Sequence, residues 1–203
     1  MRDDRGSTLP IYIWVTAILL FAAFAFFAFA QAASARNGAQ SAADAAALAA
    51  TQSVRDELLD DLIQSVGNED EDWMDRLDPG SFDGLNAGPA DAAASDLAAQ
   101  NDATVAYGPA FRLVNGYPGY EVGVETQSTV GDTIIPGTES MHATAHATAV
   151  LKPRCDFDTE ADPEKPLELH CDGALGDVII DPEDLDPADL PDASDLFSVH
   201  LAD

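Results

Sequence analysis

The feature that most constrains this chain is a run of residues without a charge, from Leu9 to Ala35. A helix needs about 20 apolar residues to cross a hydrocarbon core of about 30 Å, and this run is long enough. Pro10 stands at its start, where a first-turn proline is tolerated, and Tyr12 and Trp14 follow, as interfacial aromatic residues do. The sequence therefore predicts a transmembrane helix over residues 9–35, preceded by a short segment, residues 1–8.

Two questions about this helix are whether it is cleaved off as a signal peptide and which of its ends lies in the cytoplasm. A cleaved signal peptide has an apolar core of about 7–15 residues; the small residues of "AQAASA" would suit cleavage, but the run is longer. Arg2 and Arg5 precede the run and only Arg36 follows closely. The positive-inside rule then places residues 1–8 in the cytoplasm. We expect a retained single-pass anchor in the cell membrane, with an extracellular C-terminal domain.

Helical spacing continues through an Ala-rich stretch beyond the run. From Val54 the pattern becomes amphipathic, and Gly67-Asn68 is a good C-cap. Residues 36–67 are therefore predicted to continue the membrane helix, giving one helix of about 85 Å at ~1.5 Å per residue. One stripe of small residues recurs at steps of three and four: Ala35, Ala39, Ala42, Ala46, Ala49 and Ser53. Because small side chains let another backbone come close, we expect a helix-packing interface, covered by the chain's own domain or by neighbouring helices.

The chain beyond the membrane helix is strongly acidic. After residue 36 it holds 35 acidic and 6 basic residues, a net charge of −29. Such a domain repels nucleic acids and anionic lipid head groups. We therefore expect the membrane as a partner through the apolar helix, no nucleic acid, and an acidic surface that keeps an extracellular domain soluble.

Two regions follow the long helix. Residues 68–109 are polar, acidic and rich in Gly, Pro and Ala, and are predicted to connect the helix to the domain, with a short turn at "DEDWMDRL" and a short helix after Pro89. From residue 110 apolar residues alternate with period two, as in half-buried strands, and Asn115-Gly116 and Pro118-Gly119 are turn signals. Residues 110–203 are expected to form a β-rich acidic domain of about four antiparallel strands. The predicted fold class is α+β, with this sheet packed on the amphipathic half of the helix.

The clearest alternation runs from Met141 to Leu151. Alanines occupy one face of this predicted strand, and His and Thr occupy most of the other. An Ala-lined strand would let an Ala-lined helix approach the sheet closely. "PLELHCDG" and "DLFSVHLAD" are predicted to be further strands, the first returning from an acidic hairpin loop.

Cys155 and Cys171 are the two cysteines of the chain. An even count permits one disulfide if the domain faces an oxidising compartment. Two unpaired buried thiols are the alternative.

No pattern in the sequence indicates catalysis or a bound cofactor. The chain lacks a nucleophile elbow, a Gly-rich phosphate loop and a paired-cysteine metal knuckle, and we expect no enzyme. His142 and His146 would be aligned as metal ligands on a helix. On the strand that the alternation predicts they would lie about 13 Å apart at ~3.3 Å per residue, too far to share one zinc ion.

An acidic run near the first cysteine has the spacing with which an EF-hand loop begins. The pattern then departs, because Ala161 stands where the loop needs glycine and Leu167 where it needs a bidentate Glu. A solvated hairpin loop is the simpler interpretation, and we expect no dedicated metal site. The weak calcium candidates are Asp156, Asp158, Glu160 and Asp162.

Two features at the ends of the apolar helix carry a family resemblance. Arg5-Gly6 stands before it, and "AQSAADAAALAA" stands after it. With these features the first 52 residues resemble the N-terminal module of the TadE/TadG-like proteins of the tight-adherence (Flp-type) pilus system. The resemblance implies a pilin-like fold and a minor pilin-like or pilus-assembly component. Its partners would be other pilin or pilus-assembly proteins, reached through the long helix.

The resemblance also implies a candidate processing site between Gly6 and Ser7. The pseudopilin branch of the family is cut after this glycine by a prepilin peptidase and carries Glu at the fifth position beyond it. This chain has Ile11 at that position, so an uncleaved TadG-like membrane protein fits at least as well. The alternative function is a membrane-anchored extracellular binding domain that uses its acidic loops for calcium or a basic partner.

Overall fold

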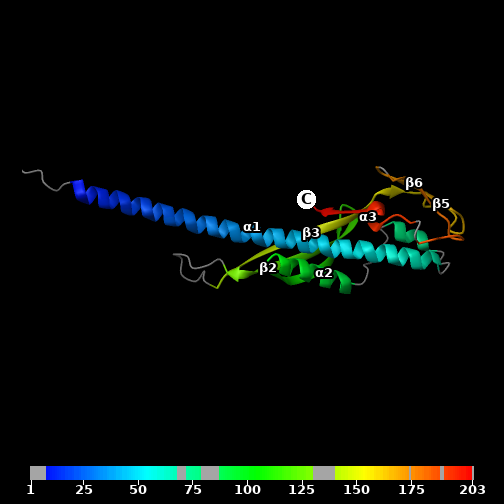
Figure 1. Cartoon of the computed structure of the whole chain (residues 1–203), viewed down its shortest axis with the longest axis horizontal. Coiled ribbons are helices and arrows are strands. Elements are labelled where there is room, and N and C mark those ends of the chain that lie inside the picture. The colour runs from blue at the N-terminus through cyan, green and yellow to red at the C-terminus, as the bar shows by residue number, and fades with distance from the viewer. Residues whose placement is uncertain are drawn as a thin grey trace, which may run out of the picture.

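The computed structural model describes residues 8–67, 72–78, 87–129, 140–173, 175–187 and 190–202. It consists of a long apolar N-terminal helix followed by a small domain of antiparallel sheets (Figure 1). The predicted α+β fold class is confirmed. The N-terminal half of the helix projects from the domain, and the C-terminal half forms part of it.

Helix α1 (Thr8–Gly67) is a single helix of 60 residues, which corresponds to about 90 Å at 1.5 Å per residue. Pro10 lies in its first turn and Gly67 ends it, as the capping signals indicate. The large apolar side chains from Leu9 to Phe29 are exposed. Among the described residues, α1 is the one helix long and apolar enough to cross a membrane.

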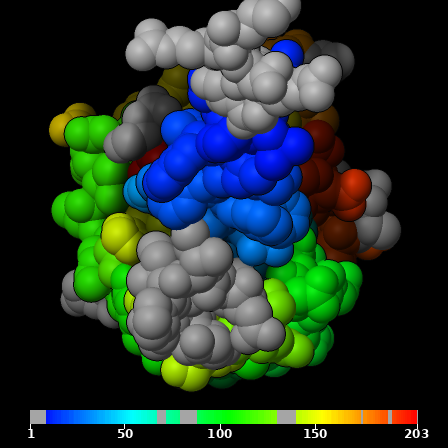
Figure 2. All heavy atoms as spheres, turned by 90° about the vertical axis from the view of Figure 1, so that its left-hand side faces the viewer, coloured from blue at the N-terminus to red at the C-terminus, as the bar shows by residue number. Residues whose placement is uncertain are grey.

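The main sheet has four antiparallel strands in the order β1-β2-β3-β7. These are β1 (Ala103–Val114), β2 (Tyr117–Thr129), β3 (His142–Pro153) and β7 (Phe197–Leu201). Helices α1 and α2 (Ala87–Gln100) lie on one face of this sheet, α1 over β2 and β3 and α2 beside α1 over β1. Figure 2, viewed from the N-terminal end of α1, shows the blue helix in front with green segments on both sides of it.

A second sheet joins the far end of the domain. Strands β4 (Cys155–Asp156), β5 (Leu167–Cys171) and β6 (Gly176–Ile180) pair antiparallel in that order. Their inner side chains share a buried cluster with the last turns of α1, the 3-10 helix η1 (Trp73–Leu77), α3 (Ala193–Leu196) and the first residue of β7. The indole Nε1 of Trp73 donates to the carbonyl of Pro163, and Arg76 Nε pairs with Asp61 at 2.7 Å. These bonds fasten η1 between α1 and the acidic loop.

The structure departs from the sequence-based expectation in three places. β1 begins at Ala103 rather than at residue 110, because a bulge between Tyr107 and Ala110 accommodates Gly108 and Pro109, which interrupt the alternation. Pro118-Gly119 is no turn, since both residues lie near the start of β2, where a missing amide is tolerated. The main sheet packs mainly on the Ala-rich half of α1, whereas the amphipathic half, which we expected the main sheet to cover, shares a buried cluster with η1, α3, the second sheet and only Leu151 and Phe197 of the main sheet.

Candidate functional site

The most unusual surface of the molecule is the side of α1 that enters the domain. Seven small residues of this side, which we call the small-residue face, have no exposed surface. They are Ala39, Ala42, Ala43, Ala46, Ala47, Ala50 and Thr51. Of the predicted stripe, Ala39, Ala42 and Ala46 belong to this face, whereas Ala35, Ala49 and Ser53 lie beside it and are partly exposed.

The small-residue face is covered by the chain's own domain. Helix α2 presents Ala90, Ala94 and Ala98 at steps of four residues, all fully buried, and belongs to the same cluster. From the sheet side, Ala147 and Ala149 of β3 complete it. Both contacts are therefore alanine against alanine, which brings the helix backbone close to a second helix and to a sheet.

Hydrogen bonds hold this close contact in register. Thr51 is fully buried, and its hydroxyl donates to the carbonyl of Ala47 at 2.9 Å while lying 3.3 Å from the carbonyl of Ala149. Gln40 Nε2 donates to Asp44 at 2.8 Å and to the carbonyl of His146 at 3.4 Å. The two polar side chains thus tie α1 to β3 across a surface that offers little apolar area.

The single stripe predicted at steps of three and four leaves out four of the seven residues of this face. Ala43, Ala47, Ala50 and Thr51 form a second row beside the predicted one. The sequence does indicate this second row, through the adjacent alanines in "AADAAALAAT". A helix that is buried against two elements needs an apolar surface wider than one stripe, and adjacent alanines provide it. Thr51 of this second row lies against Ala149 of β3, and the two rows together are buried in the cluster that α1 shares with α2 and the main sheet.

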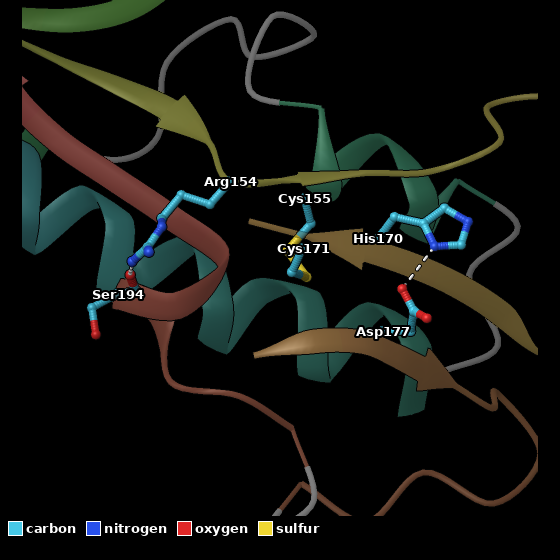
Figure 3. The surroundings of a disulfide bond; sticks show 6 residues. All are labelled: Arg154, Cys155, His170, Cys171, Asp177 and Ser194. Carbon is cyan, nitrogen blue, oxygen red and sulfur yellow. Dashed lines mark hydrogen bonds and ion pairs between the residues drawn. A yellow bond between two sulfur atoms is a disulfide. The ribbon is translucent and has the colours of Figure 1, made fainter. Parts of the chain in front are cut away.

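The predicted disulfide is confirmed. Cys155 and Cys171 are directly opposed on β4 and β5 and are bonded (Figure 3). The neighbouring Arg154 accepts a hydrogen bond at its carbonyl from Asp172 N and donates from its guanidinium to the carbonyl of Ser194. The disulfide and these bonds connect the second sheet to α3.

The outer face of the second sheet carries a histidine among carboxylates. His170 Nδ1 lies 2.9 Å from Asp177 Oδ1, and Figure 3 shows the two side chains pointing toward one another. Their hydrogen bond raises the pKa of His170 above its ordinary value, and the charges of Asp177, Glu168 and Asp156 act in the same direction. The ligand atoms of Glu168, His170 and Asp177 lie within 4.8 Å of one another, and all three residues are exposed. The arrangement favours the protonated form of the His170 imidazole.

The four calcium candidates are not brought together. Among the described residues, none of them belongs to a group of three close metal-ligating side chains. Asp156 lies opposite His170, and Asp158 accepts a hydrogen bond from the amide of Glu160. Lys165 Nζ donates to Asp162 at 2.6 Å, and this bond lowers the pKa of that carboxyl. These contacts are those of a hairpin loop held by its own hydrogen bonds. Calcium binding by this loop stays an untested prediction.

The two histidines of β3 lie on the strand that the alternation predicts. Both His142 and His146 are exposed, and His142 Nδ1 lies 2.7 Å from the carbonyl of Thr126. The candidate processing site at Gly6 and Ser7 falls outside the described residues.

A comparison with protein families finds a match for the N-terminal part of the chain. Residues 6–53 match the model of a family described as "Putative Flp pilus-assembly TadE/G-like". The N-terminal module is TadE/G-like. This match confirms the predicted resemblance and covers the exposed apolar part of α1 together with the small-residue face. No curated protein and no solved structure matched the chain.

The TadE/G-like module ends where the character of α1 changes. The match stops at residue 53, one residue before Val54, where larger apolar residues replace the alanines. The rest of α1 and the sheets lie outside the matched range. The module therefore contains both the segment apolar enough to cross a membrane and the small-residue face on which α2 and the main sheet are packed.

Proposed function

We propose that this protein is a structural or assembly component of a tight-adherence (Flp-type) pilus system. The TadE/G-like match suggests a role in Flp pilus assembly and a membrane-anchored helix. Within that role, the chain would act as a minor pilin-like subunit or as a TadG-like single-pass membrane protein. Its partners would be other pilin or pilus-assembly proteins.

The observation that carries this proposal is how the matched residues are used in the structure. Their first part, to Phe29, consists of apolar side chains that no part of the described domain covers. Their last part, from Ala39 to Thr51, is buried in the domain. One end of this continuous helix is apolar and exposed, and the other end is packed in the domain. Such a helix is suited to hold a domain at a membrane surface.

Topology is the second element of the proposal. The Cys155–Cys171 disulfide supports an oxidising environment for the domain. The arginines at positions 2 and 5 support a cytoplasmic N-terminus. Both arguments give the same orientation, with the domain outside the cell membrane.

The same family description, of a pilus-assembly component, supports a structural role. Three exposed side chains, those of Asp162, Lys165 and His170, have pKa values shifted mainly by a hydrogen bond to an oppositely charged neighbour. Such pairs are explained by their ionic contacts and need no substrate.

Two measurements on cells that carry the pilus system test the proposal. Deletion of the gene should abolish or reduce pili, and re-expression of the full chain should restore them. Unchanged piliation in the deletion strain would contradict an assembly role.

The second measurement separates the two forms of the proposal. Sheared surface filaments and membranes are fractionated, and the N-terminus of the protein is identified by mass spectrometry. A chain that begins at Ser7 in the filament fraction indicates a processed minor pilin. An intact chain that is confined to membranes indicates a TadG-like assembly factor. A Gly6→Leu variant is the control, because it should block processing in the first case and change nothing in the second.

A further inference from the structure

The base of the domain lies beside a part of α1 that sequence alone would place inside the membrane. A hollow of about 320 Å³ separates α1 from the end of the main sheet. On the helix it is lined by Gln31, Ser34, Ala35 and Gly38. On the domain it is lined by Asn101, Asp102, Thr126, Ser128 and Thr129, which we call the domain base. The domain therefore reaches down to the level of residues 31–38.

Polar groups of the domain base exclude it from the hydrocarbon core. Asp102 is exposed, and a charge at the centre of a bilayer costs several kcal/mol. Ser128 and Thr129 are exposed at the end of β2, and their hydroxyl groups would lose their hydrogen bonds to water in lipid. The hydrocarbon must then end before Gln31, because α1 is rigid and continuous past this point.

The remaining apolar helix fits a bilayer. The segment from Leu9 to Ala30 has 22 residues, about 33 Å at 1.5 Å per residue, against a hydrocarbon core of about 30 Å. The head-group region adds roughly 5–8 Å on each side. Residues 31–35 rise about 7 Å and so fall within this region. The domain base at their level would lie there too.

We propose that the domain base sits in the head-group layer of the outer leaflet and that phospholipid head groups enter the hollow beside α1. The membrane span is then Leu9–Ala30 rather than residues 9–35, and the fold itself sets its end. Figure 2 looks along α1 from its N-terminal end, the side on which the membrane would lie. This inference rests on the membrane anchoring in the proposed function and does not depend on a role in pili.

Zwitterionic head groups are the partner that the chemistry fits. The chain beyond residue 36 carries a net charge of −29, which repels anionic lipids. Asp102 at the domain base favours an amine or ammonium group, and the hydroxyl and amide groups of Ser34, Ser128 and Gln31 are suited to bind phosphate and glycerol oxygens. Phosphatidylethanolamine and phosphatidylcholine both meet these requirements.

Depth-dependent fluorescence quenching tests the inference on the full chain. The native cysteines form the disulfide, so a single added cysteine can be labelled with a fluorophore under oxidising conditions. The protein is reconstituted in vesicles of phosphatidylcholine and phosphatidylethanolamine, with nitroxides on either the head group or the acyl chain. Three variants report three depths: Ser128→Cys at the domain base, Ala22→Cys in the span and Asp75→Cys at the far end of the domain.

The far-end position is a matched surface control. Arg76 pairs with Asp61, which places Asp75 at the level of a helix residue about 45 Å beyond Gln31 at 1.5 Å per residue. We expect head-group nitroxides to quench the Ser128→Cys label severalfold more than the Asp75→Cys label. Acyl-chain nitroxides should quench the Ala22→Cys label most strongly.

Each outcome has a distinct meaning. A quenched Ala22→Cys label with an unquenched Ser128→Cys label would overturn the contact of the base with the membrane and leave the anchor intact. Stronger quenching of Ser128→Cys by acyl-chain than by head-group nitroxides would overturn the proposed depth. An unquenched Ala22→Cys label would overturn the anchored helix, and with it both this inference and the membrane part of the proposed function.

Discussion

Replacement of Ala46 by Leu should destabilise the domain because the small-residue face has no room for a larger side chain. Ala46 is fully buried in the cluster that joins α1, α2 and the main sheet. A leucine there adds three carbon atoms. A cavity further along α1, lined by Thr51, Val54 and Leu58 but not by Ala46, offers only about 10 Å³, at most the space of one water molecule. The added atoms must therefore displace either α2 or β3.

The expected magnitude follows from this lack of space. Overpacking of a filled core costs about 1–3 kcal/mol. For a domain of this size each kcal/mol shifts the melting temperature by roughly 2–4 °C, so Ala46→Leu should lower it by about 2–12 °C. The same substitution at Ala92, an exposed position of α2, should change it little, because Leu and Ala have similar helix propensity.

Tryptophan fluorescence provides the assay. Trp73 is buried in the second cluster, whereas the other tryptophan, Trp14, lies in the apolar segment of α1. Thermal unfolding of the full chain in detergent micelles is followed in a Trp14→Phe background, so that Trp73 alone reports on the domain. Equal melting temperatures for the Ala46→Leu and Ala92→Leu variants would refute the close packing. A stable Ala46→Leu variant that fails to support pili would show instead that this face serves a neighbouring protein.

Three further predictions address other parts of the domain. Reduction of the disulfide, whose cysteines are 16 residues apart, should cost about 3 kcal/mol by the loop-entropy model, and chemical unfolding with and without reductant checks this value. Gly119→Ala should destabilise the domain by about 1–3 kcal/mol, because its Cβ would collide with a backbone carbonyl of β3, whereas the helical control Gly88→Ala meets no atom; equal unfolding free energies would contradict the collision. Asp177→Asn should lower the raised pKa of His170 toward its ordinary value of 6.5 in an NMR titration. The native ion pair stabilises the fold below pH 6.5, and its contribution disappears as the pH rises through the raised pKa of the folded state; an unchanged pKa in the variant would refute the pairing.

The elements with strong local signals could be predicted from the sequence. The uncharged run, the alanine-rich spacing and Gly67 define α1, because helix propensity and capping act within a few residues. The alternation from Met141 to Leu151 likewise defines β3, whose alanines face inward. The hairpin turn at Asn115-Gly116 lies between β1 and β2 as its sequence indicates.

The parts that sequence did not predict depend on contacts between distant segments. β6 is five residues long and is defined by its pairing with β5 rather than by an alternation of its own. Gly108-Pro109 interrupts the alternation of apolar residues, so the sequence suggests that no strand passes through it. The pairing with β2 on both sides of these residues shows that β1 continues through them with a bulge. The adjacent alanines indicate the second row of the small-residue face, but its burial depends on distant segments, since Ala43 and Ala47 belong to the cluster that α1 shares with α2 and the main sheet.

The burial of the small-residue face reduces the part of α1 that is available to bind partner proteins. From Ala39 to Thr51 the small side chains that would allow a close helix–helix approach are already used by the chain's own α2 and β3. The apolar segment before Gln31 is exposed and stays open to contacts with other helices of a pilus system. That segment also contains small residues at helical spacing, Ala22 and Ala25 among them, between phenylalanines, and small residues are what permit close packing of helices within a bilayer. Under the proposed function, the two halves of the TadE/G-like module would thus divide two tasks, with assembly inside the membrane and attachment of the domain outside it.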